Sequence, residues 1–302
     1  MVIVQLKNLR YQYHDGTCAL QGVSLDIFKG EFLSILGQNG SGKTTLLKHL
    51  NGLLKPAAGE VVLGQRPLHK YPEREVFQKV GMVFQDPNDQ LFAPSVWDDV
   101  AFGPTNLGLP KDEVAQRVEE ALSLVEMWPY TDKAVDALSF GQKKRVCIAG
   151  VLAMKPDVLV LDEPTCGLDP AGVTAIMTLL KDLNKRRGIT VIMATNAVDL
   201  APVYMDRLAI MYQGSVLRVG APEEVFSHID EINHACLELP QIAQLMQALR
   251  DNDHLPMERL PLTIAEARRF LVQQLPGRHS TIGLEEPGRV GIAHRKTSNV
   301  DG

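Results

Sequence analysis

The sequence predicts an α/β fold built on a parallel sheet, and three observations predict it. The runs 158–161 and 190–194 are apolar on both faces, as strands of a helix-covered parallel sheet are. The mostly apolar run 32–36 leads into a Gly-rich loop, after which 44–54 continues as a helix. Residues 2–27 alternate apolar and polar, which indicates a separate, half-exposed antiparallel sheet.

The composition is that of a globular protein with a sizeable core. Of 302 residues, 45% are hydrophobic and 22% charged, and 31 Lys and Arg stand against 36 Asp and Glu. A net charge of −5 gives no electrostatic footprint for wrapping nucleic acid, so we expect no nucleic-acid partner.

The chain divides into a main domain and a helical extension. Residues 1–228 carry the strand runs once, without an internal repeat, so we expect one nucleotide-binding unit per chain. A helix-rich insert occupies about 88–156, and the run 207–220, with Gln213-Gly214 at its middle, predicts a closing hairpin. Residues 229–279 are expected to be helical, and 280–302, which lack periodicity, to be disordered. Within the insert, helical spacing forms one apolar stripe from Val114, Val118, Leu122 and Val125.

A phosphate-binding loop is predicted at 37–45 (GQNGSGKTT), which fits G-x-x-x-x-G-K-[ST] between a strand and a helix. Glycines let consecutive backbone N–H groups point at phosphates, and the helix adds its positive dipole end. Lys43 supplies a charge to the terminal phosphates, and Thr44 a hydroxyl to Mg²⁺. The candidate ATP-binding residues here are Gly37, Asn39, Gly40, Ser41, Gly42, Lys43, Thr44 and Thr45.

Two acids follow the buried run 158–161. Asp162, at the carboxyl end of a strand beside the phosphate loop, is expected to orient Mg²⁺. Glu163 is then placed to polarise or deprotonate the water that attacks the terminal phosphate.

The segment 138–145 (LSFGQKKR) predicts a second anion site. Ser139 and Gln142 have capping-box spacing, so a helix should begin at Ser139. A capped helix N-terminus with a hydroxyl and with Gly141 beside it favours an anion.

Taken together, these segments resemble the ATP-binding-cassette (ABC) ATPases over residues 2–228. The motifs that carry the resemblance, in order along the chain, are 37–45, Gln85, 138–145, 158–170 (VLVLDEPTCGLDP) and the strand near Ala194. The resemblance implies a P-loop NTPase with a RecA-like parallel sheet core, an N-terminal antiparallel sheet, a helical insert and a C-terminal helical extension. It also implies a head-to-tail homodimer with ATP and Mg²⁺ between the two copies.

The same resemblance assigns roles to particular residues. Ser139 and Gly141, with Gln142, would contact the nucleotide held by the partner copy, and Asp169 would lie in the loop that crosses the dimer interface. Gln85 would link Mg²⁺ to the insert, which touches an integral membrane subunit. Tyr13, or alternatively Tyr11, would stack on adenine; the spacing of two puts both on one strand face.

Two further stretches, 84–110 and 200–226, are similar to the ATPases of energy-coupling-factor importers, and most of all to cobalt-transport ATPases. This similarity implies a peripheral protein on the cytoplasmic face of a membrane, with the extension stabilising the dimer. Nickel or a vitamin is the alternative cargo. A translation or DNA-repair ATPase of the cassette type is the alternative class, disfavoured because the chain has one phosphate loop and no long heptad run.

One residue departs from the family pattern in a way that affects chemistry. The run 190–194 should lead to a histidine near the terminal phosphate, and this chain has Asn196. An amide donates a hydrogen bond but does not titrate, so we expect ATP binding with strongly reduced hydrolysis. A natural weak ATPase, a substitution that traps the ATP state and a regulatory nucleotide-binding module all fit this residue. The other departure, Phe140 in place of glycine, falls at a position that varies.

Overall fold

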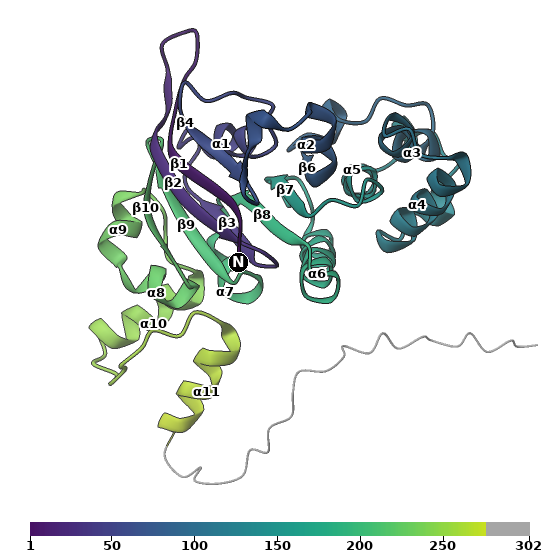
Figure 1. Ribbon diagram of the computed structural model, residues 1–302. Helices are drawn as coiled ribbons and strands as arrows, with labels where there is room; N and C mark the ends of the chain where they lie inside the picture. Colours follow the sequence, from purple (N-terminus) through teal and green to yellow (C-terminus); the bar gives the residue numbers. More distant parts are fainter. Residues whose placement is uncertain (276–302) are drawn as a thin grey trace, which may run out of the picture.

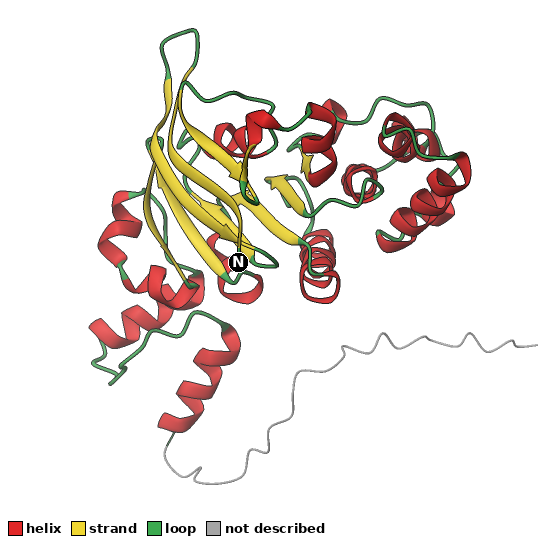
Figure 2. Ribbon diagram, viewed as in Figure 1, coloured by secondary structure: helices red, strands yellow, loops and turns green. Residues whose placement is uncertain are grey.

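The computed structural model describes residues 1–275, and its centre is a six-stranded sheet of order β10-β9-β3-β8-β7-β6 (Figures 1 and 2). The strands from β9 to β6 are parallel, and β10 pairs antiparallel with β9. This confirms the expected parallel core and the closing hairpin. The strands are β3 (Phe32–Leu36), β6 (Val80–Val83), β7 (Val158–Asp162), β8 (Thr190–Thr195), β9 (Arg207–Tyr212) and β10 (Ser215–Gly220).

A second, antiparallel sheet of order β2-β1-β4-β5 lies over one face of the first. It was expected from the alternation near the start of the chain, although its third and fourth strands come from after the phosphate loop. The strands are β1 (Val2–Gln12), β2 (Cys18–Phe28), β4 (Ala58–Leu63) and β5 (Arg66–Pro67).

Successive side chains of the central strands point to opposite faces of the sheet and pack in two separate hydrophobic cores. Leu33 and Ile35 of β3 pack with the antiparallel sheet and helix α1 (Lys43–Leu50). Phe32 and Leu36 pack on the opposite side, with the insert and helix α6 (Pro170–Arg187). Because both faces are covered, the parallel strands are almost entirely apolar, and the charged and ligand-binding side chains lie at their ends.

Helix α1 is shorter than the sequence predicts. It ends at Leu50 rather than near Leu54, because Asn51 leaves the helical conformation and Gly52 takes a left-handed φ of 80°. After it, the chain runs through β4 and β5, the 3₁₀ turn η1 (Leu68–Lys70) and helix α2 (Glu73–Lys79) into β6.

The helical insert projects to one side of the central sheet (Figure 1). The stripe predicted for α4 is buried, with Val118, Leu122 and Val125 fully enclosed, which confirms that expectation. The insert comprises η2 (Pro87–Asp89), α3 (Val96–Asn106), α4 (Lys111–Leu124), η3 (Trp128–Tyr130), η4 (Val135–Ala137) and α5 (Phe140–Leu152).

The chain after β8 ends in helices beside the β9–β10 hairpin, away from the insert (Figure 1). Arg218 of β10 forms an ion pair with Glu231. The rings of Tyr212, in β9, and His234 pack with their centroids 4.9 Å apart. These two contacts attach the extension to the edge of the sheet. The expected disordered segment 280–302 lies outside the described residues. The elements here are η5 (Val198–Leu200), α7 (Ala201–Tyr204), α8 (Pro222–Ser227), α9 (Ile229–His234), α10 (Gln241–Asp251) and α11 (Ile264–Gln274).

Candidate nucleotide-binding site

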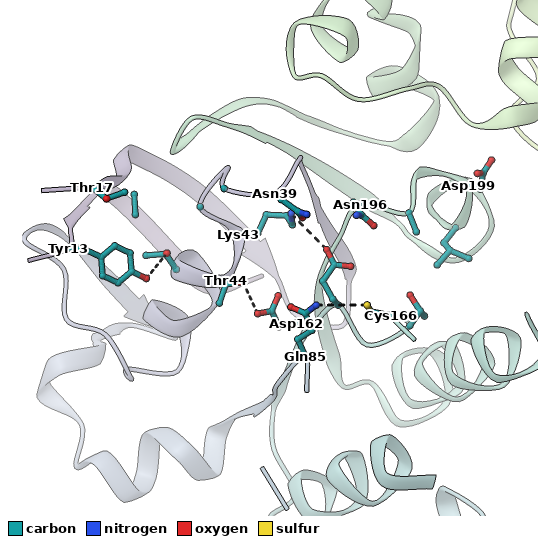
Figure 3. A pocket seen from close by; sticks show the side chains of 18 of the residues that line it. Tyr13, Thr17, Asn39, Lys43, Thr44, Gln85, Asp162, Cys166, Asn196 and Asp199 are labelled. Atoms are coloured by element: carbon teal, nitrogen blue, oxygen red, sulfur yellow. Dashed lines mark hydrogen bonds and ion pairs between the residues drawn. The ribbon is translucent and has the colours of Figure 1, made fainter. Parts of the chain in front are cut away.

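A pocket of about 680 Å³ lies where β3, β7 and β8 end at their carboxyl edge (Figure 3). Ligands of open α/β sheets bind at this edge, because loops and helix N-termini meet there. The pocket brings together residues that the sequence singled out in five separate segments. Its lining includes Tyr13, Asn39, Gly40, Gly42, Lys43, Thr44, Thr45, Gln85, Asp162, Glu163 and Asn196.

The loop before α1 has the shape of an anion cradle. Gly42 caps α1 with a left-handed φ of 101°, and a Cβ there would lie 2.5 Å from the Ala19 carbonyl oxygen. A Cβ on Gly37 would lie 2.5 Å from the carbonyl oxygen of Met211. Both positions therefore require glycine. Gly37 and the buried Ser41 support the loop from beneath and do not line the pocket.

Lys43 is held inside this cradle. Its Nζ donates to the carbonyl oxygens of Gly37 at 2.7 Å and Gln38 at 3.2 Å, and lies 3.9 Å from Glu163 Oε1. Burial lowers the pKa of Lys43, while the neighbouring carboxylates act in the opposite sense. A buried ammonium in a loop of backbone N–H groups is suited to binding a polyanion, which would replace carbonyl contacts by charge-assisted ones.

Thr44 and Asp162 form a pair of hard oxygen ligands. Thr44 Oγ1 donates to Asp162 Oδ2 at 2.7 Å, and Asp162 Oδ1 is buried without a partner among the described residues. Burial raises the pKa of Asp162, and the Thr44 hydroxyl opposes that shift. A carboxylate oxygen left unpaired beside a hydroxyl fits Mg²⁺, which prefers such ligands and keeps several waters.

Glu163 follows β7 in a constrained conformation. Its φ is 44°, a left-handed value that costs a non-glycine residue energy and must be held by its surroundings. Its N–H donates to Ala194 of β8 at 3.0 Å, and its carbonyl oxygen accepts from the buried Lys144 Nζ of α5 at 3.1 Å. Burial raises the pKa of the Glu163 carboxyl, with Lys43 opposing. A carboxyl placed in this way is suited to act as a general base.

Tyr13, rather than Tyr11, borders the pocket. Tyr13 lies beyond the end of β1, and its hydroxyl is 2.9 Å from Thr45 Oγ1. Tyr11 packs edge-on between Tyr13 and the buried ring of His49 and contributes to the core. The expectation that both tyrosines share one strand face is therefore wrong, because the strand stops at Gln12 before the second tyrosine.

The far end of the pocket holds Asn196, Gln85 and residues that the sequence did not single out (Figure 3). Gln85 Nε2 is 3.9 Å from the thiol of Cys166, in the loop after Glu163. Asp199, three residues after Asn196, also borders the pocket. Its nearness to Asn196 along the chain was the one signal that could have indicated it.

The predicted second anion site lies elsewhere on the chain. Ser139 and Gln142 make both bonds of the capping box at the start of α5, as predicted. Asp169 caps α6 by accepting from the Gly172 N–H at 2.7 Å. Ser139, Gly141, Gln142 and Asp169 do not line the pocket. If they contact a nucleotide, it is one bound by another copy of the chain.

Comparisons with known proteins agree with this geometry. Residues 20–166 match the ABC transporter family model. The chain is 52% identical over 278 residues to the energy-coupling factor transporter ATP-binding protein EcfA of Methanocaldococcus jannaschii, covering 91% of this chain and 99% of that protein. It is 46% identical over 272 residues to EcfA3 of Clostridium perfringens, covering 89% and 95%.

Solved structures give the same result. The chain resembles CbiO1 of Clostridium perfringens, described as part of the ABC transporter complex CbiONQ, with a TM-score of 0.71 and 46% identity over 82% of this chain and 99% of that one. It also resembles a dimeric ATP-binding cassette bound to ADP and phosphate, with a TM-score of 0.66 and 32% identity over 73% and 99%.

Proposed function

This chain belongs to the ATP-binding subunits of energy-coupling-factor ABC transporters and is an ABC-type ATPase, and from this we propose that it powers an importer by binding Mg-ATP in the pocket of Lys43. The observation that supports the site best is the grouping, in one pocket, of a caged ammonium, an unpaired buried carboxylate oxygen and a Glu with a raised pKa. Phosphoryl transfer requires phosphate binding, cation binding and activation of water. Lys43, Asp162 and Glu163 are suited to these three roles in that order.

In this proposal, the phosphates lie along residues 37–45, and Tyr13 stacks on the base. Thr44, Asp162 and Gln85 would hold Mg²⁺, which would supply positive charge to offset that of the phosphates. The Glu163 carboxylate accepts a proton from the attacking water, and the Lys144 contact holds the Glu163 backbone in its left-handed conformation while it does so.

Asn196 makes hydrolysis slow in this proposal. It is exposed at the pocket, where its amide donates toward the terminal phosphate without taking up or releasing a proton. Binding is therefore retained, while turnover is strongly reduced.

A head-to-tail dimer would complete the site. Ser139, Gly141 and Gln142 at the start of α5, and Asp169 at the start of α6, are exposed or half-buried and lie outside the chain's own pocket. A second copy would place this helix N-terminus against the first copy's nucleotide, where its dipole and free N–H groups favour phosphate. The similarity to a dimeric cassette bound to ADP and phosphate supports dimerisation.

The extension presents an apolar surface that a second copy would cover. Between α10 and α11 lies a cleft of about 590 Å³, bordered by Leu245, Ile264 and Leu275, whose exposed fractions are 53%, 72% and 55%. Exposed apolar residues that gather in this way mark an interaction surface.

Replacing Leu245 by Asp should therefore weaken self-association, because a charge would enter the proposed interface in place of an apolar side chain. Leu245 is 53% exposed, so covering it contributes about 1 kcal/mol per copy. Two copies give about 2 kcal/mol, or roughly a 30-fold weaker dimer. Sedimentation equilibrium without nucleotide measures this. The control is Leu53→Asp, which charges a residue of similar exposure (45%) outside the extension. Equal dimer affinities in the two variants would contradict a role for the extension.

A membrane subunit would dock on the groove between α2 and α3. This groove of about 450 Å³ is bordered by Phe77, Phe92 and Phe102, which are 38%, 66% and 49% exposed. It is also lined by Phe84, and the next residue, Gln85, lines the nucleotide pocket. A partner bound in the groove would therefore be coupled to the nucleotide site through these two neighbouring residues. No helix within residues 1–275 is long and apolar enough to cross a membrane. In this proposal the chain lies on the cytoplasmic face of the membrane, which its similarity to transporter ATP-binding proteins supports.

Cobalt is the proposed cargo, because the segments 84–110 and 200–226 resemble those of cobalt-transport ATPases. Nickel or a vitamin is the alternative, since relatives at 46–52% identity carry only the general energy-coupling-factor name.

The test of the proposed function is light scattering during size-exclusion chromatography, with and without Mg-ATP, together with a phosphate assay. Wild type should form a tighter dimer with Mg-ATP and release little phosphate. Lys43→Ala should lose the response to nucleotide, because the phosphate-facing charge is gone, with an affinity loss of about 100-fold. A wild type that neither binds nor responds to Mg-ATP would overturn the proposal.

A further inference from the structure

The segment after β8 is joined directly to the C-terminal extension. Asp199 borders the nucleotide pocket, as Figure 3 shows, and lies in η5, three residues after Asn196. Its Oδ1 accepts a hydrogen bond of 2.7 Å from the backbone N–H of Gln241, the first residue of α10. The two residues are 42 positions apart, so this bond links the pocket wall to another part of the fold.

The bond meets a need of α10. The first N–H groups of a helix have no partner within it, and Pro240, at the N-cap position, has no side-chain oxygen to supply one. Asp199 supplies that oxygen from a distance, and its negative charge lies at the positive end of the helix dipole.

Both ends of this bond are anchored in the same core. Val198 and Leu200, on either side of Asp199, pack against the large core cluster on the insert side of the central sheet, and Leu239 and Ala243 of the extension belong to that cluster. The other side of α10 carries Leu245 in the exposed cleft shared with α11. Helix α10 therefore stands between the surface proposed for a second copy and the segment 196–200 at the pocket.

We propose that Asp199 is a positioning residue that fixes the segment 196–200 to α10, so that docking of a second copy on α10 and α11 sets where Asn196 lies at the nucleotide. The proposal rests on the proposed function, since it assumes both nucleotide in the pocket and a second copy on the extension. By linkage, nucleotide held by Asn196 would also favour the docked extension.

The test uses a substitution that removes one N–H and little else. Gln241→Pro deletes the donor at the first position of a helix, where proline is favoured, and the ψ of 141° at Pro240 suits a residue before proline. Gln241→Ala is the matched control, because it shortens the side chain and keeps the N–H. Hydrogen exchange of segment 196–200 is measured in both variants with Mg-ATP bound.

Exchange in 196–200 is expected to be about three to ten times faster in Gln241→Pro than in Gln241→Ala, as loss of one solvent-exposed hydrogen bond allows. Nucleotide affinity should change less than about twofold. Phosphate release, measured with Asn196→His added so that turnover is measurable, should change at least about threefold. Equal exchange and equal turnover in the two variants would overturn the proposal.

A second pair of variants guards against misfolding. Asp199→Asn keeps an acceptor and should resemble wild type more closely than Asp199→Ala, which removes it. If all four variants bind Mg-ATP but do not differ, the positioning role fails alone. If wild type itself does not bind Mg-ATP, the proposed function fails first.

Discussion

Replacing Asn196 by histidine is expected to raise steady-state phosphate release by about 100-fold, the lower end of the range for a side chain that assists proton transfer. Asn196 lies at the same pocket as Glu163 and Lys43, and its amide does not titrate. An imidazole there both reaches further and exchanges a proton near neutral pH, so the phosphate and the water are better stabilised as charge shifts between them.

The control is Asn196→Gln, which extends the amide without making it titratable. If reach alone limits turnover, Gln should gain as much as His; if protonation matters, only His should gain. The pH profile of Asn196→His should show a new limb in the range of about 6 to 7, where imidazole titrates. Wild-type turnover equal to that of Asn196→His would show that asparagine serves this position as well as histidine.

Replacing Glu163 by Gln in the Asn196→His background is expected to reduce turnover by at least about 100-fold, since the general base is lost while its shape is kept. Mg-ATP binding should persist, and the ATP-bound dimer should accumulate. The comparison variant is Glu163→Asp, which keeps a carboxylate one methylene further away and should lose less. Turnover that survives in Glu163→Gln would assign the base to another group.

The same substitution should also change how stability depends on pH. Burial raises the pKa of Glu163, so the folded apo protein binds this proton more tightly than the unfolded chain does. Wild type should therefore gain stability as pH falls from neutral through that raised pKa, a gain that Glu163→Gln lacks. Thermal unfolding should show Glu163→Gln as the more stable protein at neutral pH, with the difference shrinking toward pH 4.

Much of the fold could be predicted because its signals are local. The apolar runs of β7 and β8, the Gly-rich loop before α1 and the capping box at Ser139 each occupy fewer than about ten residues and have one common structural meaning. The end of α1 was misplaced because a glycine can also lie within a longer helix, and the sequence does not show that Gly52 takes a left-handed φ of 80°.

The features that could not be predicted depend on distance in three dimensions. The hydrogen bond between Asp199 and the Gln241 N–H could not be predicted from the residues near either one in the sequence. The same holds for the bond from Lys144 to the Glu163 carbonyl oxygen. Both bonds join segments that are brought together by tertiary packing. The sequence also left open whether Tyr13 or Tyr11 lies at the nucleotide pocket, because the answer depends on where β1 ends.

The contact between Lys144 and Glu163 has a consequence for how two sites would act together. Helix α5 runs unbroken from Phe140 to Leu152, and Lys144 lies little more than one turn after Ser139. In the proposed dimer, the N-terminus of α5 contacts the nucleotide of the partner copy, while Lys144 of the same helix donates to the backbone carbonyl oxygen of Glu163 in its own copy. A change at the partner's ATP would therefore shift the catalytic Glu163 of this copy, so the two sites would hydrolyse ATP in a coupled way rather than independently.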